Sequence, residues 1–511
     1  MKKENIWIGA LLIGKILLQF LLVNPAYDLQ RDEYLHLDQA FHPAWGYLSV
    51  PPMTSWISNL IFLLGGGEFW VRFFPALVGS ITILVILKTV RALGGGFYAL
   101  ALAGTGALFS TMLRLNMLFQ PNAIDVLAWT TLFYLLVQYF KTKNRVYFYY
   151  LGICVGLGFL NKYNIAFAVL GLLPALLVTK SREIFLSRHL YGGMLIALLI
   201  ISPNLLWQYK EGWPVIHHMQ DLSATQLVNN NVGSFLKSQA LFFLGSLPVL
   251  VLALYALLFE KRFSKYRFLF WSTIFTLLFF IYFKAKDYYA FGIYPILLGF
   301  GSVYVEKAWT KKWQMALKAA LLVLPPLSLY PVKDVIFPVR SPQYVLENAE
   351  QFKSFGMLRW EDGKDHHLPQ DFADMLGWKE LAILVDSVYA NVEDKAHTIL
   401  LADNYGQAGA INYYSKFEDL RCQSFNADYV NWMDTSTTYV NAILIKEEDD
   451  EDPERLVEKP LFDTVYLVAK RIQPLAREAE ISIYVLKGAK VDVNQRIISE
   501  MEAEKNKFRN E

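Results

Sequence analysis

The chain contains 511 residues, of which 54% are hydrophobic, 15% aromatic and only 18% charged. This composition is far from that of a soluble globular protein and indicates a membrane protein. A net charge of +2 excludes a nucleic-acid-binding protein with a broad basic face, and two cysteines exclude a disulfide-stabilised secreted domain.

Apolar runs that approach the length of a membrane span recur from residue 6 to residue 330. A helix needs about 20 apolar residues to cross the bilayer core, and about eleven runs come near this length. The first run follows two lysines, as in a signal peptide, but no small-residue cleavage site comes after it, so we predict a retained first helix. The runs are Ile6–Val23, Phe69–Val90, Phe97–Leu113, Ala123–Phe140, Val146–Leu160, Ile165–Val178, Leu190–Trp207, Phe235–Phe259, Phe268–Phe283, Tyr288–Val305 and Met315–Tyr330.

Positive charges gather on alternate connections between these runs. Clusters of lysine and arginine prefer the cytoplasmic side of a membrane. A cytoplasmic N-terminus places every cluster on that side, so we predict a multi-pass protein of the bacterial inner (cytoplasmic) membrane whose chain emerges in the periplasm after the last run. The clusters are Lys88 and Arg91; Lys141, Lys143 and Arg145; Lys180, Arg182 and Arg188; Lys261, Arg262, Lys265 and Arg267; and Lys307, Lys311 and Lys312.

The composition changes near Pro331, where charges become frequent and short β-rich runs alternate with helical patterns. Such alternation is typical of a soluble α/β domain. The predicted fold class is therefore an α-helical integral membrane protein with a C-terminal soluble α/β domain in the periplasm. We expect a membrane domain over residues 1–330, with its first periplasmic loop at 24–68, and a periplasmic domain over residues 331–511. The β-rich runs are Thr398–Ala402, Tyr439–Ile445 and Ile481–Leu486.

The first periplasmic loop is predicted to contain two short helices that lie along the membrane surface. The first has one apolar face and a charged remainder, an arrangement typical of interfacial helices. Pro51 and Pro52 start the second, Met53–Leu64, and three glycines end it. The apolar face of the first helix consists of Tyr34, Leu35, Leu37 and Phe41, and its other face includes Arg31, Glu33 and Asp38.

Asp32 and Glu33 lie where this loop meets the helical bundle. A carboxylate beside lipid is costly unless it meets water, a cation or another partner. Taken alone, the two acids have a plain structural explanation, because acidic residues stabilise the N-terminus of a helix. The motifs that accompany them favour a functional role instead.

Seven motifs along nearly the whole chain have an order and spacing that resemble one family of membrane enzymes. Together they are similar to the polytopic GT-C glycosyltransferases of the protein mannosyltransferase and aminoarabinose transferase type. The motifs are Arg31-Asp32-Glu33-Tyr34; Trp45-Gly46-Tyr47 before Pro51-Pro52; Gly158–Tyr163; Asn204–Trp207 with Gly212-Trp213-Pro214; Lys286–Tyr289 with Tyr294-Pro295; Phe372–Trp378; and Asn404–Ala410.

The resemblance implies transfer of a sugar from a polyprenyl-phosphate carrier to an acceptor at the periplasmic face. Lipid A, another envelope glycan and a protein hydroxyl are the acceptors left open. Asp32 matches the family's acid at the reaction centre, and we predict that it takes the proton of the attacking hydroxyl in a single, inverting displacement. Glu33 is expected to orient Asp32, hold a cation or contact the acceptor. Where relatives carry a second acid the chain has Asn122, with Asp125 one helical turn further on.

The departing phosphate needs cations and hydroxyl donors, because negative charge grows on it during the reaction. Lys286 and Lys162 are the first candidates. For any single lysine the plain alternative is a side chain that reaches from a helix end to the membrane surface. The full predicted set is Lys286, Lys162, Arg31, Lys284, Arg114, Tyr288, Tyr289 and Tyr163.

No cofactor is assigned from the sequence, and a divalent metal ion is left open with Glu33, His36 and His42 as weak candidates. The expected partners are the lipid-linked sugar, a lipid, glycan or protein acceptor, and membrane lipids, without nucleic acid. One alternative is a transporter or lipid flippase, but those proteins place charges near the bilayer midplane, where Lys15 is the main exception here. A second alternative is a non-catalytic lipid-sugar-binding protein of the same fold.

Overall fold

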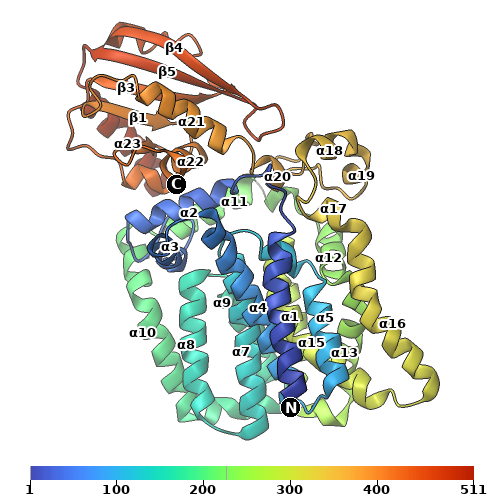
Figure 1. The fold of residues 1–511 in the computed structure, drawn as a ribbon. Coiled ribbons are helices and arrows are strands. Elements are labelled where there is room, and N and C mark those ends of the chain that lie inside the picture. The colour runs from blue at the N-terminus through green and yellow to red at the C-terminus, as the bar shows by residue number, and fades with distance from the viewer. Residues whose placement is uncertain (1, 226, 511) are drawn as a thin grey trace.

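The computed structural model describes residues 2–225 and 227–510, which form a helical bundle with a small sheet-containing domain at one end (Figure 1). Every apolar run predicted from the sequence is largely helical, although the runs Phe97–Leu113 and Phe235–Phe259 each cross a break between two helices. The main helices of the bundle are α1 (Lys2–Phe20), α4 (Glu68–Ala92), α5 (Phe97–Leu108), α7 (Asn122–Thr142), α8 (Val146–Asn161), α9 (Ile165–Leu177), α10 (Arg188–Lys210), α12 (Val232–Leu241), α13 (Leu247–Phe259), α14 (Arg267–Tyr282), α15 (Tyr294–Ala308) and α16 (Lys312–Leu329).

Only some of these helices are long and apolar enough to be complete membrane spans. Five stretches of the described chain are long and apolar enough to cross a bilayer alone, and seven are if two sharply bent helix pairs each count as one span. The predicted helical membrane fold is therefore supported, while the number of about eleven spans stays a prediction. The bent pairs are Ile165–Leu177 with Lys180–Leu186, at 109°, and Val232–Leu241 with Leu244–Phe259, at 74°.

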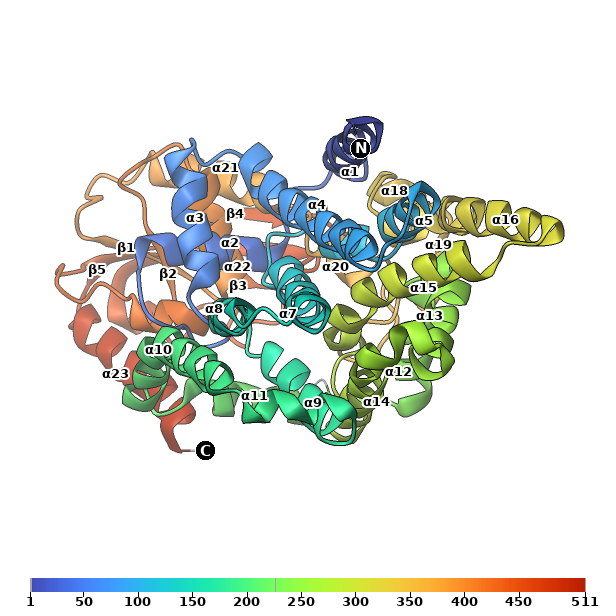
Figure 2. The ribbon, with the colours of Figure 1, turned by 90° about the horizontal axis from the view of Figure 1, so that it is seen from below.

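Small residues allow the helices to pack closely, as is typical of membrane bundles. At the crossing of α8 and α10, a Cβ added to Gly152 would lie 2.1 Å from the carbonyl oxygen of Gly193. Only glycine therefore permits this contact between the two backbones. Seen from the end opposite the sheet, α1 and α16 lie at the edges of the bundle (Figure 2).

The two predicted helices of the first loop are present as α2 (Arg31–Asp38) and α3 (Met53–Leu63). The interfacial position of α2 stays a prediction, and residues Glu33 to Asp38 are all buried within the protein. Helix α22 (Tyr405–Tyr414) of the C-terminal domain packs against α2 and covers the side that the sequence assigned to the membrane surface.

The C-terminal domain contains a mixed five-stranded sheet of order β2-β1-β3-β5-β4. The three predicted β-rich runs correspond to β1, β3 and β5, and the short β2 and the long β4 were missed. Strands β2, β1 and β3 are parallel, whereas β5 is antiparallel to both β3 and β4. The strands are β1 (Thr398–Ala402), β2 (Cys422–Ser424), β3 (Asn441–Glu447), β4 (Phe462–Ile472) and β5 (Glu480–Ala489), and the flanking helices are α21 (Trp378–Tyr389) and α23 (Val493–Asn510).

A shared hydrophobic core fixes this domain on the loop that carries α2. Tyr34 and Leu37 of α2 are fully buried in the same cluster as Trp378 and Ile411. The Tyr34 and Trp378 rings meet edge to face, with centroids 5.9 Å apart. Burial of aromatic side chains on both sides makes this contact a strong one. We call it the domain seam.

Asp38 is a buried acid at the domain seam, and its removal is expected to stabilise the protein. Its Oδ2 accepts hydrogen bonds from Asn412, at 2.7 Å, and from Tyr429. Burial raises the pKa of this carboxyl from 3.8 to about 6. The folded chain therefore holds an extra proton between about pH 4 and pH 6, so its stability falls as the pH rises through that window.

Asp38→Asn keeps the accepting oxygen without the buried charge. We expect it to raise the free energy of unfolding by up to about 3 kcal/mol at neutral pH and to change nothing below about pH 4. Thermal unfolding in detergent across this pH range measures the difference. A variant that is less stable than the parent at neutral pH contradicts the prediction.

Candidate active site

Asp32 lies in the first turn of α2, partly exposed, with a hydrogen-bond donor on each carboxylate oxygen. The Tyr405 hydroxyl donates to Oδ1 over 2.7 Å, and the Gln120 side-chain amide donates to Oδ2 over 3.1 Å. The Gln30 side chain caps the helix by accepting from the Asp32 backbone N–H, at 2.9 Å. A carboxylate has about four acceptor positions, so these contacts hold it in place and leave capacity for another donor.

Two amide side chains connect Asp32 to Lys162. The Asn122 side chain donates to Gln120 over 3.0 Å, and the Lys162 ammonium donates to the Asn122 carbonyl oxygen over 2.7 Å. The chain of contacts is thus Asp32, Gln120, Asn122, Lys162. The structure therefore brings together the predicted acid, one predicted cation and Asn122, which belongs to the predicted second acid region.

Lys162, the residue directly after α8, lies against two predicted tyrosines of the 3₁₀ helix η6 (Asp287–Ile293). Its ammonium is 4.4 Å from the Tyr289 ring centroid and 5.0 Å from that of Tyr288. Both distances suit a cation–π contact. A cation and two phenol groups thus stand together at the end of the bundle that carries Asp32.

Asp125 lies one turn after Asn122 in α7 and is linked through Asn164 to the segment that carries Tyr288 and Tyr289. Its two oxygens accept from the Trp129 indole N–H, at 3.0 Å, and from the Asn164 amide, at 2.7 Å. The same Asn164 amide donates to the carbonyl oxygen of Tyr289 over 3.0 Å. Of the two residues predicted for the second acid region, Asn122 contacts Lys162 and Asp125 braces α7 against η6.

Three of the other four predicted phosphate-binding cations contact side chains of their own. Lys286 forms an ion pair with Glu361 at 2.7 Å, and Lys284 is exposed. Arg114 binds Asp371 at 2.6 Å. The Arg31 guanidinium lies 4.3 Å above the ring of Tyr405. Arg114 and Lys286 therefore tie the bundle to the segment that leads into the C-terminal domain.

Tyr163 is placed in a separate polar cluster. Its hydroxyl donates to the Asn204 carbonyl oxygen over 3.2 Å and accepts from the Gln208 amide over 2.8 Å. Asn204 in turn donates to the backbone oxygen of Trp45 over 2.7 Å. These contacts attach the loop that follows α1 to α10, so Tyr163 acts here as a structural link.

Glu33 is 1% exposed and binds only backbone groups. Its two oxygens accept from the N–H of Phe119 and the N–H of Gln30, both at 2.6 Å. Burial raises the pKa of Glu33 to about 7, and the two N–H donors act against that rise. This contact closes a capping box on α2 and fixes the loop before α7.

The three weak metal candidates do not share a site. Glu33 is engaged by backbone groups, the His36 ring contacts the side chain of Gln39 at 3.3 Å, and the His42 ring stacks on Trp432 at 4.3 Å. Within residues 2–225 and 227–510, no group of three or more His, Cys, Asp or Glu side chains is placed to hold a metal ion.

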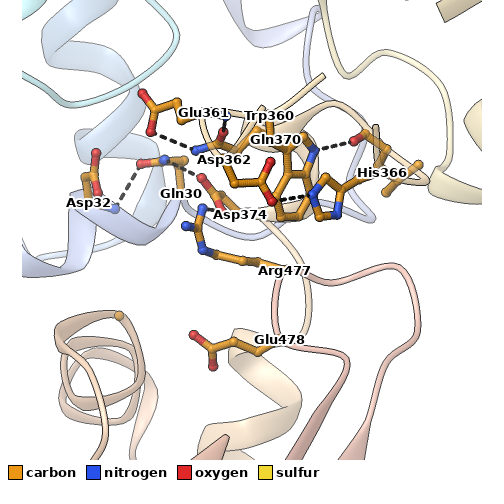
Figure 3. Close-up of polar contacts among 12 residues, drawn as sticks. Gln30, Asp32, Trp360, Glu361, Asp362, His366, Gln370, Asp374, Arg477 and Glu478 are labelled. Atoms are coloured by element: carbon orange, nitrogen blue, oxygen red, sulfur yellow. Dashed lines mark hydrogen bonds and ion pairs between the residues drawn. The ribbon is translucent and has the colours of Figure 1, made fainter. Parts of the chain in front are cut away.

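A second polar network anchors the start of α2 to the C-terminal segment (Figure 3). Gln30 donates to the Asp374 carboxylate over 3.3 Å, and Arg477 pairs with the same carboxylate at 2.9 Å. On the same side, Gln370 donates to Glu361 over 3.2 Å. The position of Asp32 is therefore set from both the bundle and the C-terminal domain.

Sequence reasoning missed two residues that touch Asp32, namely Gln120 and Tyr405. Gln120 lies in the short connection just before α7, next to the Pro121-Asn122 pair that the sequence did single out. Tyr405 belongs to the Asn404–Ala410 motif, but no local pattern links a residue of the C-terminal domain to one 373 positions earlier. Only the folded chain reveals that contact.

Comparisons with known proteins identify the fold of this chain and the group of enzymes that it resembles. Residues 49–207 match the family described as dolichyl-phosphate-mannose-protein mannosyltransferase. The structure of ArnT from Cupriavidus metallidurans bound to undecaprenyl phosphate has a TM-score of 0.63 and 15% identity, over 94% of this chain and 98% of that chain. Its apo structure has a TM-score of 0.60 and 13% identity, over 94% and 97%. The chain therefore has the GT-C type fold, and the predicted resemblance to the mannosyltransferase and aminoarabinose transferase group is confirmed.

Two curated relatives from Rhizobium johnstonii share part of the sequence. Lipid A galacturonosyltransferase RgtD is 28% identical over 184 residues, which are 35% of this chain and 38% of the relative. Lipopolysaccharide core galacturonosyltransferase RgtB is 27% identical over 217 residues, 40% of this chain and 43% of the relative. The matches thus span less than half the length of either relative.

Proposed function

We propose that this protein is an inverting glycosyltransferase of the bacterial inner membrane that moves a sugar from a polyprenyl-phosphate donor to lipid A or a related envelope acceptor. The observation that carries the proposal is the side-chain connection from Asp32 through Gln120 and Asn122 to Lys162. It joins an acid that can accept a proton to a cation that can receive a phosphate, at one end of the bundle.

The chemistry assigned to each group follows from this geometry. The acceptor hydroxyl oxygen forms a bond to the anomeric carbon while the bond from that carbon to the phosphate oxygen breaks. Asp32 takes the hydroxyl proton, and Lys162 balances the charge left on the phosphate, with Tyr288 and Tyr289 as nearby hydroxyl donors. Because one displacement occurs, the anomeric configuration inverts. Lys286 is the second cation proposed for the phosphate, after release from Glu361.

The proposed orientation of the protein in the membrane is supported by the two ends of α7. This helix of 21 residues begins at Asn122, in contact with Lys162, and ends at Thr142, a rise of about 30 Å. The predicted cytoplasmic cations Lys141 and Lys143 therefore lie a membrane thickness away from Asp32. This supports a periplasmic reaction centre under the positive-inside rule.

The donor and acceptor classes rest on the relatives. The fold neighbour was solved with undecaprenyl phosphate, and both curated relatives are named for lipid A or lipopolysaccharide core as acceptors. A transporter is the weaker candidate, because the acid and cation lie at the bundle's end. Lys15, a buried lysine within α1, donates to the backbone oxygen of Ala76 over 2.8 Å. This hydrogen bond gives the lysine a structural role, so it does not require a transport site.

Mass spectrometry of envelope lipids from cells with and without the gene tests the proposal. We expect one lipid A or core species to lose a single sugar residue in the deletion strain and to regain it on complementation. Purified protein should then transfer that sugar from its polyprenyl phosphate to the lipid isolated from the deletion strain. An unchanged set of lipids, glycans and glycoproteins would refute it.

A further inference from the structure

We propose that Tyr405 is a positioning residue of the reaction centre, so that the C-terminal domain completes the active site as well as covering it. This inference rests on the proposed function, because it assigns Tyr405 an effect on transfer through Asp32. Its basis is the 2.7 Å hydrogen bond that the Tyr405 hydroxyl donates to Asp32 Oδ1.

The backbone at Tyr405 is held firmly. Tyr405 is the first residue of α22, whose N-cap Asn404 accepts hydrogen bonds from the N–H groups of Gly406 and Gln407, at 2.8 and 3.1 Å. The amide of Asn404 donates in turn to the carboxylate of Glu478 over 2.8 Å. The start of α22 and the connection between β4 and β5 therefore together fix the backbone from which the Tyr405 ring extends.

Arg31 holds the ring itself in place. Its guanidinium lies 4.3 Å over the ring centroid, and a Cβ added to Gly406 would come within 2.6 Å of the Arg31 side chain. The arginine is thus packed tightly between α2 and the start of α22. Since Arg31 directly precedes Asp32, one short stretch of α2 supplies both the group that stacks on the ring and the group that accepts from its hydroxyl.

The polarity of the hydrogen bond is fixed as well. Burial and the neighbouring Asp32 carboxylate raise the pKa of Tyr405 well above its ordinary value. The phenol therefore stays protonated at physiological pH, and Asp32 is the acceptor. With Gln120 on the other oxygen, the plane of the carboxylate is set by one donor from the bundle and one from the C-terminal domain. A base held in this way presents its free lone pairs in one direction, which favours proton transfer.

Helix α22 also provides a matched control. Tyr414, near its other end, donates to the Glu68 carboxylate at the start of α4 over 3.0 Å. This is again a tyrosine of α22 bonded to an acid of the membrane domain, but the acid is not Asp32. A purely structural role for such bonds predicts the same outcome for both tyrosines, whereas a positioning role distinguishes them.

The test compares the full-length parent with Tyr405→Phe, Tyr414→Phe and Asp32→Asn, each reconstituted in lipid nanodiscs. We expect Tyr405→Phe to lower kcat roughly tenfold to a hundredfold, the range for loss of a hydrogen bond to a charged group, with the donor KM unchanged. Tyr414→Phe should keep kcat within about twofold, and both should shift the melting temperature by similar amounts.

Full kcat for Tyr405→Phe, or an equal loss in Tyr414→Phe, overturns the inference. Asp32→Asn separates this failure from failure of the proposed function. If Asp32→Asn is inactive while Tyr405→Phe is fully active, only the role of Tyr405 is wrong. If Asp32→Asn transfers sugar as the parent does, the role of Asp32 is wrong, and the inference falls with it.

Discussion

Asp32→Asn is expected to lower the rate of sugar transfer by about 10³-fold while the protein stays folded and binds its donor. Asparagine has nearly the same shape and can still accept from Tyr405, but it cannot take the proton of the attacking hydroxyl. General-base catalysis contributes about 10² to 10⁴ in rate, which sets the size of the expected loss. Initial rates with purified donor and acceptor, at saturating concentrations of both, measure it.

Asp38→Asn is the matched control for this experiment. Asp38 ends the same short helix, is also acidic, and bonds to Asn412 and Tyr429 of the C-terminal domain rather than to Gln120 or Tyr405. We expect it to keep the parent rate and to be more stable at neutral pH. If Asp32→Asn is as active as Asp38→Asn, Asp32 is not the base. If both variants are inactive, the cause is damage at the domain seam.

The helices of the bundle were predictable because long apolar runs have few alternatives in a membrane. The same reasoning did not show what covers α2. Its apolar face fits a membrane surface, and nothing local indicates that α22 of the C-terminal domain packs against it. Amphipathic character shows that one face will be buried, but the identity of the covering surface depends on tertiary packing.

The sequence singled out Asp32 and Lys162, which the structure connects through two amide side chains, but it did not reveal the contacts of the other candidates. Glu33 follows Asp32 directly and looked equally suited to chemistry, yet it binds the N–H groups of Gln30 and Phe119. The usual sequence signature of a capping box starts with serine or threonine, and here Gln30 takes that place. Arg114 looked like a free cation, because its partner Asp371 lies 257 positions further along the chain.

Lys162→Gln is expected to weaken donor binding and slow transfer together, with a loss of roughly a hundredfold in kcat/KM. Lys162 is bonded to Asn122 and packed on Tyr288 and Tyr289, so its charge is directed toward one confined place. Glutamine can keep the bond to Asn122 but carries no charge to balance the departing phosphate. Hydrogen bonds to charged groups contribute about 1.5–3 kcal/mol each, which corresponds to a factor of ten to more than a hundred.

Two further variants identify the charge at this position as the cause. Lys162→Arg keeps the charge and should recover part of the activity, although its planar group fits the two rings differently. Lys284→Gln removes an exposed lysine on the same side of the bundle and should change kcat/KM by less than about twofold, because an exposed cation interacts weakly through water. If donor binding depends on Lys284 and not on Lys162, the phosphate binds at the loop before η6 instead. The path from Asp32 through Gln120 and Asn122 would then be a support for the helix ends and not a link between base and leaving group.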